Sequence, residues 1–214
     1  VEIFDLGQKK KIVSSKGHQN RITGIDWMPR RNLVATASGD GTVRIWNEKG
    51  DSVKTINSIT GSPYSVVFTP DGKKMIVGMS NGKVKLYDTG NWKETDSVQS
   101  GSSLLNLKVD EMGKYILTSG DKGQLFLWNL KNHQPPRQLK GHTNNIYGVS
   151  FHPNGRYAIS ASYDLSVKIW DVATGECMLT LKEFKNELYT VAITSDGKKL
   201  VVSDVGGDIH IFEF

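Results

Sequence analysis

Short runs rich in β-branched and aromatic residues alternate with turn-forming residues along the chain, and no segment has the spacing of an amphipathic helix. The segment 141–182 shows this pattern clearly. Its residues His152–Gly155 predict a turn, because Asn and Gly tolerate a positive φ and Pro cannot donate within a strand ladder. Farther along, Lys168 lies between Val167 and Ile169, the alternation expected of a half-buried strand. The pattern predicts four strands in this segment: Ile146–Phe151, Tyr157–Ala161, Ser166–Asp171 and a weaker one at Cys177–Leu181.

These runs belong to a repeat, which three independent columns of residues define. Aromatic residues end one run of each repeat at Phe4, Trp46, Tyr87, Trp128, Trp170 and Phe212, with separations of 42, 41, 41, 42 and 42. A glycine column lies at Gly72, Gly113, Gly155 and Gly197, and a proline column at Pro29, Pro70 and Pro153. Four antiparallel strands in about 42 residues are typical of one blade of a β-propeller.

The repeats resemble the WD40 family over essentially the whole chain. The matching motifs are Gly17-His18, Gly141-His142, the dipeptide Trp170-Asp171 and the tight turn Ser38–Val43. The resemblance implies an all-β WD40 β-propeller with about five blades present and one continuous domain over 1–214. We predict the end of a preceding blade at 1–16 and repeats one to five at 17–57, 58–99, 100–140, 141–182 and 183–214.

The two ends of the chain bear on the size of the propeller. Val1–Asp5 fits the third strand of a preceding blade, and Phe214 falls on the third strand of repeat five. We therefore expect this chain to be part of a seven-bladed propeller, which needs about 290 residues. In the alternative, a five-bladed ring closes if Ile12–Ser14 completes the last blade, but Val1–Asp5 is then surplus. An isolated piece of a propeller is expected to expose unpaired strand edges and to aggregate.

In the WD40 family a buried tetrad of His, Ser or Thr, Asp and Trp locks the turns of a blade by hydrogen bonding. The resemblance places such tetrads only in repeats one and four, at His18, Thr36, Asp40 and Trp46 and at His142, Ser160, Asp164 and Trp170. The other repeats depart from the pattern and lack the His, with Asn81 and Tyr87 in repeat two, Lys122 and the shifted Asp121 in repeat three, and Gly206 and Phe212 in repeat five. We expect these three blades to depend on apolar packing.

His142, Ser160 and Asp164 also supply the residue types of a catalytic triad. The structural interpretation is favoured, because a satisfied buried network locks a turn and the chain has no Gly-x-Ser-x-Gly nucleophile turn. His133, His152 and His210 have no second ligand at metal spacing, and no phosphate-binding or dinucleotide fingerprint is present. We expect no enzymatic activity, no cofactor, no metal and no small-molecule substrate.

Composition adds only a few constraints to this picture. The chain has 214 residues, a net charge of +5 and a single cysteine, Cys177, for which we expect a buried structural role in a reducing compartment. It contains no stretch of about 18 apolar residues and no sequence resembling a signal peptide, so we expect an intracellular protein, cytoplasmic or nuclear, with no membrane contact. The small basic excess permits RNA contact. Lys9–Lys11 is interpreted as a solvated loop.

Partner binding is expected at one end of the strands. The apolar positions of each first strand, such as Ile146 and Val149, are three apart, which breaks the strand period of two and predicts a bulge. In the family, the residue within this bulge projects at the upper rim of the propeller's channel; here that column reads Thr23, Tyr64, Leu105, Tyr147 and Tyr189. Neighbouring columns add Arg21, Asn145, Tyr163 and Glu187 to the predicted partner-binding set. In the alternative, these tyrosines only pack between blades.

The sequence therefore favours a non-enzymatic scaffold that binds proteins or peptides within a multisubunit complex. The first alternative is an RNA-binding or ribonucleoprotein subunit. A cullin ubiquitin ligase substrate receptor is disfavoured, because that motif needs an acid after the aromatic residue and a base soon afterwards. Trp170–Ala173 lacks the base and Trp128–Lys131 lacks the acid.

Overall fold

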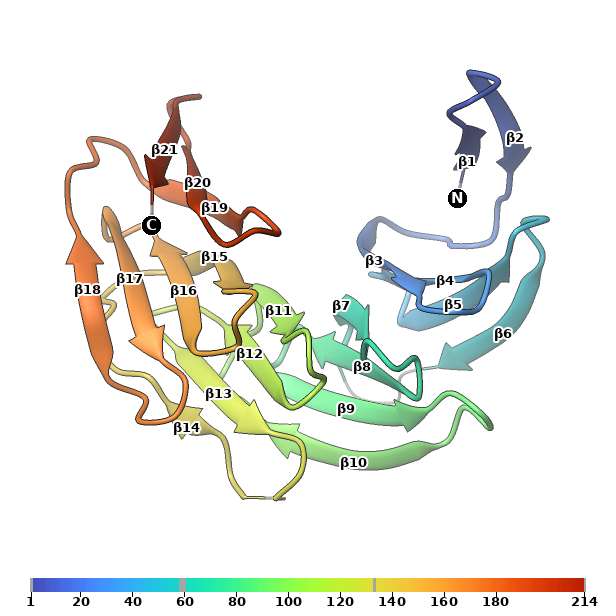
Figure 1. Ribbon diagram of the computed structural model, residues 1–214. Coiled ribbons are helices and arrows are strands. Elements are labelled where there is room, and N and C mark those ends of the chain that lie inside the picture. The colour runs from blue at the N-terminus through green and yellow to red at the C-terminus, as the bar shows by residue number, and fades with distance from the viewer. Residues whose placement is uncertain (1, 58–60, 133, 214) are drawn as a thin grey trace. The chain divides into compact units, whose positions relative to one another are not determined.

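The computed structural model describes residues 2–57, 61–132 and 134–213. Within these ranges β-strands are the only regular secondary structure. The strands form six antiparallel sheets, and each sheet lies within one of the predicted repeats or the segment before them (Figure 1). The all-β class of the prediction is therefore confirmed. In the described part of the chain there is no helix that could cross a membrane.

The strands are grouped into two compact units, which we describe separately. The N-terminal unit comprises Val1–Ser80 and Lys85–Ser97, and the C-terminal unit comprises Asn81–Val84 and Val98–Phe214.

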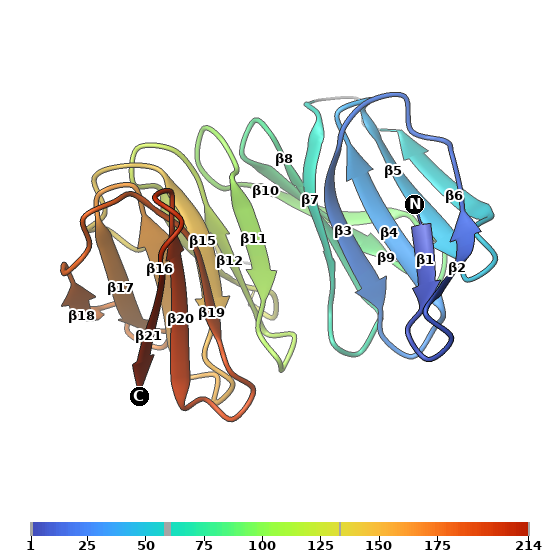
Figure 2. The same ribbon diagram turned by 90° about the horizontal axis from the view of Figure 1, so that it is seen from above.

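In the N-terminal unit a two-stranded sheet is followed by two four-stranded sheets whose strands pair in chain order. The first strands of the two larger sheets, β3 and β7, lie side by side, and a core that includes Met28, Ile45, Phe68 and Met75 fills the space between them (Figure 2). The strands are β1 (Glu2–Asp5) and β2 (Lys10–Ser14); β3 (Ile22–Met28), β4 (Leu33–Ser38), β5 (Thr42–Asn47) and β6 (Ser52–Asn57); and β7 (Pro63–Phe68), β8 (Lys74–Met79), β9 (Lys83–Asp88) and β10 (Glu94–Gln99).

In the C-terminal unit three sheets succeed one another, and their first strands β11, β15 and β19 are neighbours. One core, around Trp170, lies between the first two sheets, and another, around Phe184, lies between the last two. The strands are β11 (Asn106–Val109), β12 (Tyr115–Ser119), β13 (Leu125–Asn129) and β14 (Arg137–Gln138); β15 (Ile146–Phe151), β16 (Tyr157–Ser162), β17 (Ser166–Asp171) and β18 (Cys177–Leu181); and β19 (Leu188–Ile193), β20 (Lys199–Asp204) and β21 (Ile209–Glu213).

The four strands predicted for 141–182 are confirmed, with β16 one residue longer than expected. The predicted turn between β15 and β16 is also present, since the Gly155 N–H donates to the His152 carbonyl at 2.9 Å and Gly155 has a φ of +70°. The prediction that β17 is half-buried is wrong. Val167 and Ile169 pack toward the next sheet while Trp170 packs toward the preceding one, so sheets cover both faces of β17.

Cys177 is exposed on β18, the outer strand of its sheet, so the expectation of a buried cysteine is wrong. The outer strand has a sheet neighbour on one side only, and its residues Cys177, Met178 and Leu179 remain exposed. Burial of a free cysteine is a tendency of the residue type, and strand position overrides it here.

The bulge predicted from the three-residue apolar spacing is present in four of the five first strands. The register between first and second strand shifts between Ile22 and Gly24, Pro63 and Ser65, Ile146 and Gly148, and Leu188 and Thr190. The residue inside each shift is Thr23, Tyr64, Tyr147 or Tyr189. In the remaining sheet β11 begins at Asn106, and Leu105 lies just before it with its N–H donated to the Ser119 carbonyl.

Candidate functional site

The end of each sheet that carries these bulges also carries the turn between its second and third strands, and we call it the upper end. In the sheet β15–β18 this end is held by a chain of hydrogen bonds. The Trp170 indole N–H donates to Ser160 Oγ at 2.9 Å, Ser160 Oγ lies 2.7 Å from His142 Nε2, and His142 Nδ1 lies 2.8 Å from Asp164 Oδ2. Asp164 also accepts the Thr143 N–H at 3.0 Å, which ties the loop before β15 to the turn after β16.

The direction of each bond follows from the donors available. An indole N–H can only donate, so Ser160 Oγ accepts from Trp170. An ionised carboxylate can only accept, so His142 carries a proton on Nδ1 and donates it to Asp164. In this neutral tautomer Nε2 of His142 accepts the hydroxyl proton of Ser160. Every polar group in this line has a partner, which is the condition for a buried network to stabilise a fold.

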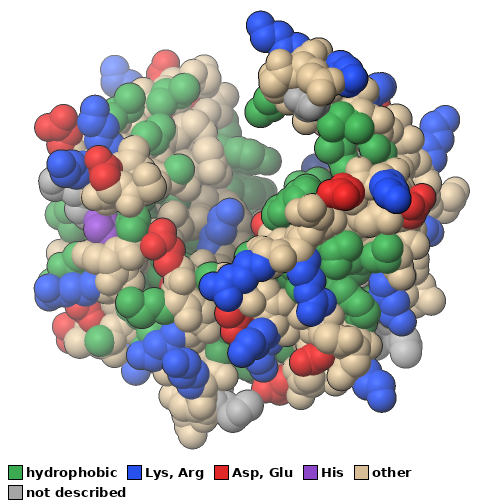
Figure 3. Space-filling model, turned by 45° about the vertical axis from the view of Figure 1, so that its right-hand side comes forward, with side chains coloured by type: hydrophobic (Ala, Val, Ile, Leu, Met, Phe, Trp, Pro, Cys, Tyr) green, Lys and Arg blue, Asp and Glu red, His purple; other side chains and the backbone are tan. Residues whose placement is uncertain are grey.

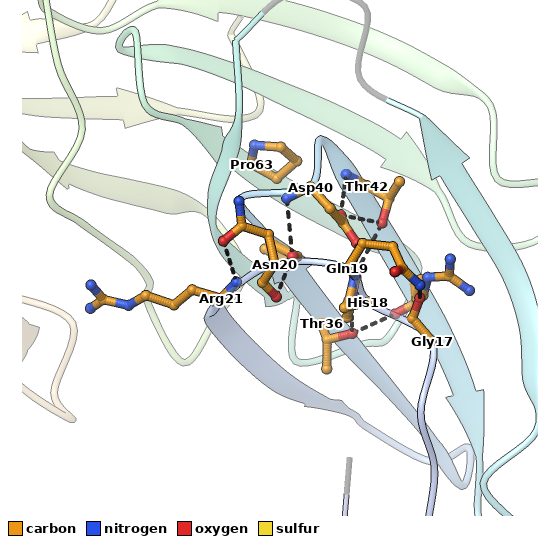
Figure 4. A network of polar contacts seen from close by, with 12 residues as sticks. Gly17, His18, Gln19, Asn20, Arg21, Thr36, Asp40, Thr42 and Pro63 are labelled. Atoms are coloured by element: carbon orange, nitrogen blue, oxygen red, sulfur yellow. Dashed lines mark hydrogen bonds and ion pairs between the residues drawn. The ribbon is translucent and has the colours of Figure 1, made fainter.

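The sheet β3–β6 of the N-terminal unit repeats the arrangement (Figure 4). Trp46 donates to Thr36 Oγ1 at 2.7 Å, Thr36 Oγ1 lies 2.7 Å from His18 Nε2, and His18 Nδ1 lies 2.9 Å from Asp40. Asp40 accepts the Gln19 N–H at 2.9 Å, as Asp164 accepts that of Thr143. The two predicted tetrads therefore have the same geometry.

Both tetrad carboxylates titrate far from their ordinary range. Burial acts to raise the pKa of Asp164, but the hydrogen bonds from His142 and Ser166 outweigh it and hold the pKa well below its usual value. For Asp40, burial is likewise outweighed, here by the hydrogen bonds from Thr42, Gln19 and His18, and its pKa is also lowered. Both networks are therefore built around an ionised carboxylate.

The order Ser–His–Asp matches that of a hydrolase triad, but the surroundings differ. Ser160 is fully buried, with 0% of its surface exposed, and its oxygen is already occupied by the indole of Trp170. A nucleophile must reach the carbonyl carbon of a substrate, and Ser160 has no open approach. The network is arranged to hold two loops together.

The sheet β19–β21 carries apolar side chains at three tetrad positions, but it does not depend on apolar packing alone, so that expectation is wrong for repeat five. The buried Asp204 accepts a hydrogen bond from the side-chain amide of Asn186 at 3.3 Å and lies 3.1 Å from His210 Nε2. Phe184 stands at the His position and Phe212 at the Trp position, with their ring centroids 5.9 Å apart at 70°. Val202, fully buried at the Ser position, belongs to the same core. In repeat two, Val77 and Tyr87 are buried in the core at the corresponding positions, and the residues at the His position lie outside the described ranges.

The sheet β11–β14 does not rely on apolar packing alone, so that expectation is wrong for repeat three. Ser100 at the His position and Thr118 at the Ser position are both buried and hydrogen-bond to each other. Gln124 Oε1 accepts the Ser102 N–H at 2.8 Å and so ties the loop to the turn as Asp164 does. Asp121 accepts the hydroxyl of Ser102 at 3.1 Å. Gln124 lies two residues after the Asp column, which is why a search of that column alone missed it.

Three tyrosines gather at the upper end of the C-terminal unit, and we call them the tyrosine cluster: Tyr147, Tyr163 and Tyr189. The rings of Tyr147 and Tyr189 are stacked, with centroids 5.2 Å apart at 20°, and the ring of Tyr163 lies 4.6 Å from that of Tyr147. Tyr189 is 53% exposed, and the other two are half-buried. Within the described residues, none of the three hydroxyls takes part in a hydrogen bond. The cluster therefore presents aromatic surface and unused hydroxyl groups to solvent.

Two residues that the sequence interpretation missed position this cluster. A Cβ added at Gly148 would lie 2.8 Å from the Val191 nitrogen and 2.9 Å from Thr190 Cα, so only glycine lets β15 and β19 approach so closely. This approach brings the adjoining Tyr147 against Tyr189. Asn106 donates its side-chain N–H to the Tyr147 carbonyl at 2.7 Å and fixes the bulge from the other side. Gly24 makes the same close approach in the N-terminal unit, and the recurrence at one column was a usable signal.

The remaining predicted partner-binding residues are less concentrated. In the N-terminal unit Arg21 is exposed and extends away from the tetrad (Figure 4), and Tyr64 is half-buried. The hydroxyl of Thr23 is within hydrogen-bonding distance of the carbonyls of Ala37 and Pro63, so it joins neighbouring sheets. In the C-terminal unit Leu105, Asn145 and Glu187 are half-buried, and the carbonyls of Asn145 and Glu187 accept the N–H groups of Tyr163 and Val205. The tyrosine cluster is thus the densest group of predicted site residues.

Charge is mixed on the part of the surface that Figure 3 shows, where basic and acidic side chains are interspersed. In the N-terminal unit, a surface cavity of about 380 Å³ is lined by Arg30, Arg31 and Lys73 but also by Asp71 and Asp88. The acidic residues offset the attraction that such a site would have for phosphate.

Comparison with known proteins agrees with this architecture. The family model described as "WD domain, G-beta repeat" matches residues 9–47, 50–88 and 133–171, together more than half of the chain. Each matched range begins near an outer strand and ends one residue after the aromatic column, so its boundaries differ from those of the predicted repeats.

Relatives include periodic tryptophan protein 2 of Arabidopsis thaliana, which is 25% identical over 99% of this chain, and THO complex subunit 3 of the same plant, which is 24% identical over 89%. WD repeat-containing protein AAC3 of Dictyostelium discoideum is 30% identical over 80% of the chain. The chain spans 24%, 61% and 37% of the lengths of these three relatives.

Proposed function

This chain belongs to the WD40 repeat family, and we propose that it is a non-enzymatic scaffold that binds other proteins within a multisubunit complex. The observation that carries the proposal is the tyrosine cluster. Tyrosine offers a large contact area and a hydrogen-bonding group at little cost in rotamer entropy, and it is enriched among the residues that dominate binding energy. A partly exposed group of three, with unused hydroxyls, suits a protein-binding surface.

The relatives support the same class of function. THO complex subunit 3 is, by its name, a subunit of a complex, and it is similar to 89% of this chain. A rigid stack of sheets presents a preformed surface, so we expect little change of conformation on binding. The cytoplasmic or nuclear location expected from the sequence remains part of this proposal.

The non-enzymatic part of the proposal rests on Ser160. Because this serine is fully buried and its oxygen accepts a hydrogen bond from Trp170, we expect no labelling by a fluorophosphonate probe in the folded protein. Mass spectrometry of the labelled protein checks this, with the denatured protein and a known serine hydrolase as controls. Modification of Ser160 in the folded state would contradict the proposal.

The binding part is tested by Tyr147→Ala in the full-length protein. Removing the central ring of the tyrosine cluster should cost about 2 kcal/mol of binding, a roughly thirtyfold loss of affinity, with little loss of fold stability. Affinity purification followed by mass spectrometry should then recover fewer partners with the variant than with the wild type. Lys198→Glu is the control, because Lys198 is exposed in the turn at the lower end of β20.

The outcomes of this experiment separate the two binding classes. If Tyr147→Ala retains every partner while Lys198→Glu loses them, the upper end is not the binding surface. If recovery disappears after nuclease treatment and affinity falls steeply with salt, the RNA-binding alternative replaces the scaffold.

A further inference from the structure

The tyrosine cluster has an acidic neighbour. Glu187 lies just before β19, where its carbonyl accepts the Val205 N–H at 2.9 Å and so fixes its backbone at the upper end. Its side chain is half-buried, and within the described residues its carboxylate forms no ion pair and accepts no hydrogen bond. Burial raises the pKa of Tyr163, and Tyr147, Glu187 and Tyr189 add to that increase.

These groups select for positive charge. The face of an aromatic ring carries negative potential and attracts cations within about 6 Å. A carboxylate beside the rings adds a charge-assisted hydrogen bond for the same cation. A phosphate or a partner carboxylate would instead be repelled by Glu187. The carboxylate of Asp164, also at this end, is already occupied by His142 and Ser166.

Arginine fits this arrangement better than lysine. Its guanidinium is planar, so it can stack on a tyrosine ring while its edge donates to a carboxylate. Tyr189 is more than half exposed, so one ring of the stack is open to such contact. Lysine, a compact and strongly hydrated charge, gains less from a stacked surface.

We propose that the upper end of the C-terminal unit binds an arginine side chain of a partner protein, stacked on the tyrosine cluster and paired with the carboxylate of Glu187. This inference rests on the proposed scaffold function and assigns the chemistry of its partner. Because a cation between a carboxylate and exposed rings satisfies both, the partner segment is expected to be basic.

The test uses the full-length protein and a glycine–serine peptide with a central pair of arginines, labelled with an uncharged fluorophore. Matched peptides carry citrulline or lysine in place of arginine, and binding is followed by fluorescence anisotropy. The arginine peptide should bind, the lysine peptide should bind more weakly, and the citrulline peptide, which keeps the shape but lacks the charge, should not bind.

Variants locate the site. Glu187→Gln should lower the affinity for the arginine peptide about tenfold or more, because a charge-assisted hydrogen bond is lost. Tyr189→Ala should lower this affinity by a similar factor. Glu176→Gln is the matched control and should change nothing, because Glu176 is exposed in the turn between β17 and β18 at the lower end of the sheet. Unchanged thermal midpoints would show that the variants are folded.

The arginine inference is overturned if citrulline or lysine peptides bind as well as arginine, if Glu187→Gln binds like the wild type, or if the arginine peptide does not bind. Each of these results leaves the scaffold proposal standing as long as Tyr147→Ala still loses partners in the affinity purification. Retention of all partners by Tyr147→Ala, in contrast, overturns the scaffold surface itself.

Discussion

Replacing Asp164 with Ala tests whether the hydrogen-bond chain stabilises the sheet β15–β18. The carboxylate accepts from three donors: His142 Nδ1 at 2.8 Å, Ser166 Oγ at 2.5 Å and the Thr143 N–H at 3.0 Å. Thr143 is exposed, so water can replace its bond, but His142 and Ser166 are buried. A buried donor left without a partner costs about 1–3 kcal/mol. With two such donors and some access for water, we expect a loss of about 3 kcal/mol.

Asn81→Ala is the matched comparison at the same position of repeat two. Asn81 is exposed, and its side chain accepts a single bond, from the Lys83 N–H at 3.2 Å. Its removal should cost less than about 1 kcal/mol. Urea unfolding of both variants in the full-length protein measures the difference, with an unchanged denaturant slope as the sign that only stability has changed. Equal shifts of the two midpoints would refute the claim that complete tetrads lock their sheets.

Three further predictions concern the tetrad carboxylate, the close approach of β15 to β19 and the apolar core of the sheet β19–β21. Asp164→Asn should be less stable than the wild type at neutral pH, and the gap should close in urea titrations as pH falls below the carboxyl's ordinary value of 3.8, because a lowered folded-state pKa stabilises only while the group is ionised. Gly148→Ala should force β15 away from β19 and lower the thermal midpoint, whereas an unchanged midpoint would show that the strands can adjust. Val202→Ser should cost about 1–3 kcal/mol in urea unfolding, because its hydroxyl would be buried next to Phe184 and Phe212; a neutral result would mean that it finds a partner.

Much of the fold followed from periodicity. An aromatic residue recurs every 41 or 42 residues, so Trp46, Trp128 and Trp170 could be aligned from spacing alone. The bulge at Tyr147 was also predictable, because an apolar spacing of three cannot fit a regular strand.

Other features depend on contacts between sheets, which a single repeat does not encode. The alternation in β17 indicated one buried face, but stacking of sheets on both sides buries Val167 and Trp170 alike. The role of Gln124 lies within a single repeat and was missed for a different reason: its longer side chain, two residues beyond the aspartate column, accepts the N–H of Ser102, one residue farther along the loop than the N–H that Asp164 accepts. The recurrence of glycine at Gly24 and Gly148 indicates a close approach of two strands, but it does not show that Tyr147 stacks on Tyr189, because that contact depends on the distance between the two backbones.

The apolar set in the sheet β19–β21 has a consequence for how such repeats diverge. Phe184, Val202 and Phe212 replace three polar partners together, and the fourth position is Gly206. Changing only the histidine or only the serine of an intact tetrad leaves the remaining buried polar groups without partners, which lowers the stability of the fold. The first substitution from a polar to an apolar set is therefore disfavoured, even though the complete apolar set packs well. The substitutions at these positions are therefore epistatic. Once a repeat carries the apolar set, no single substitution restores a complete polar tetrad.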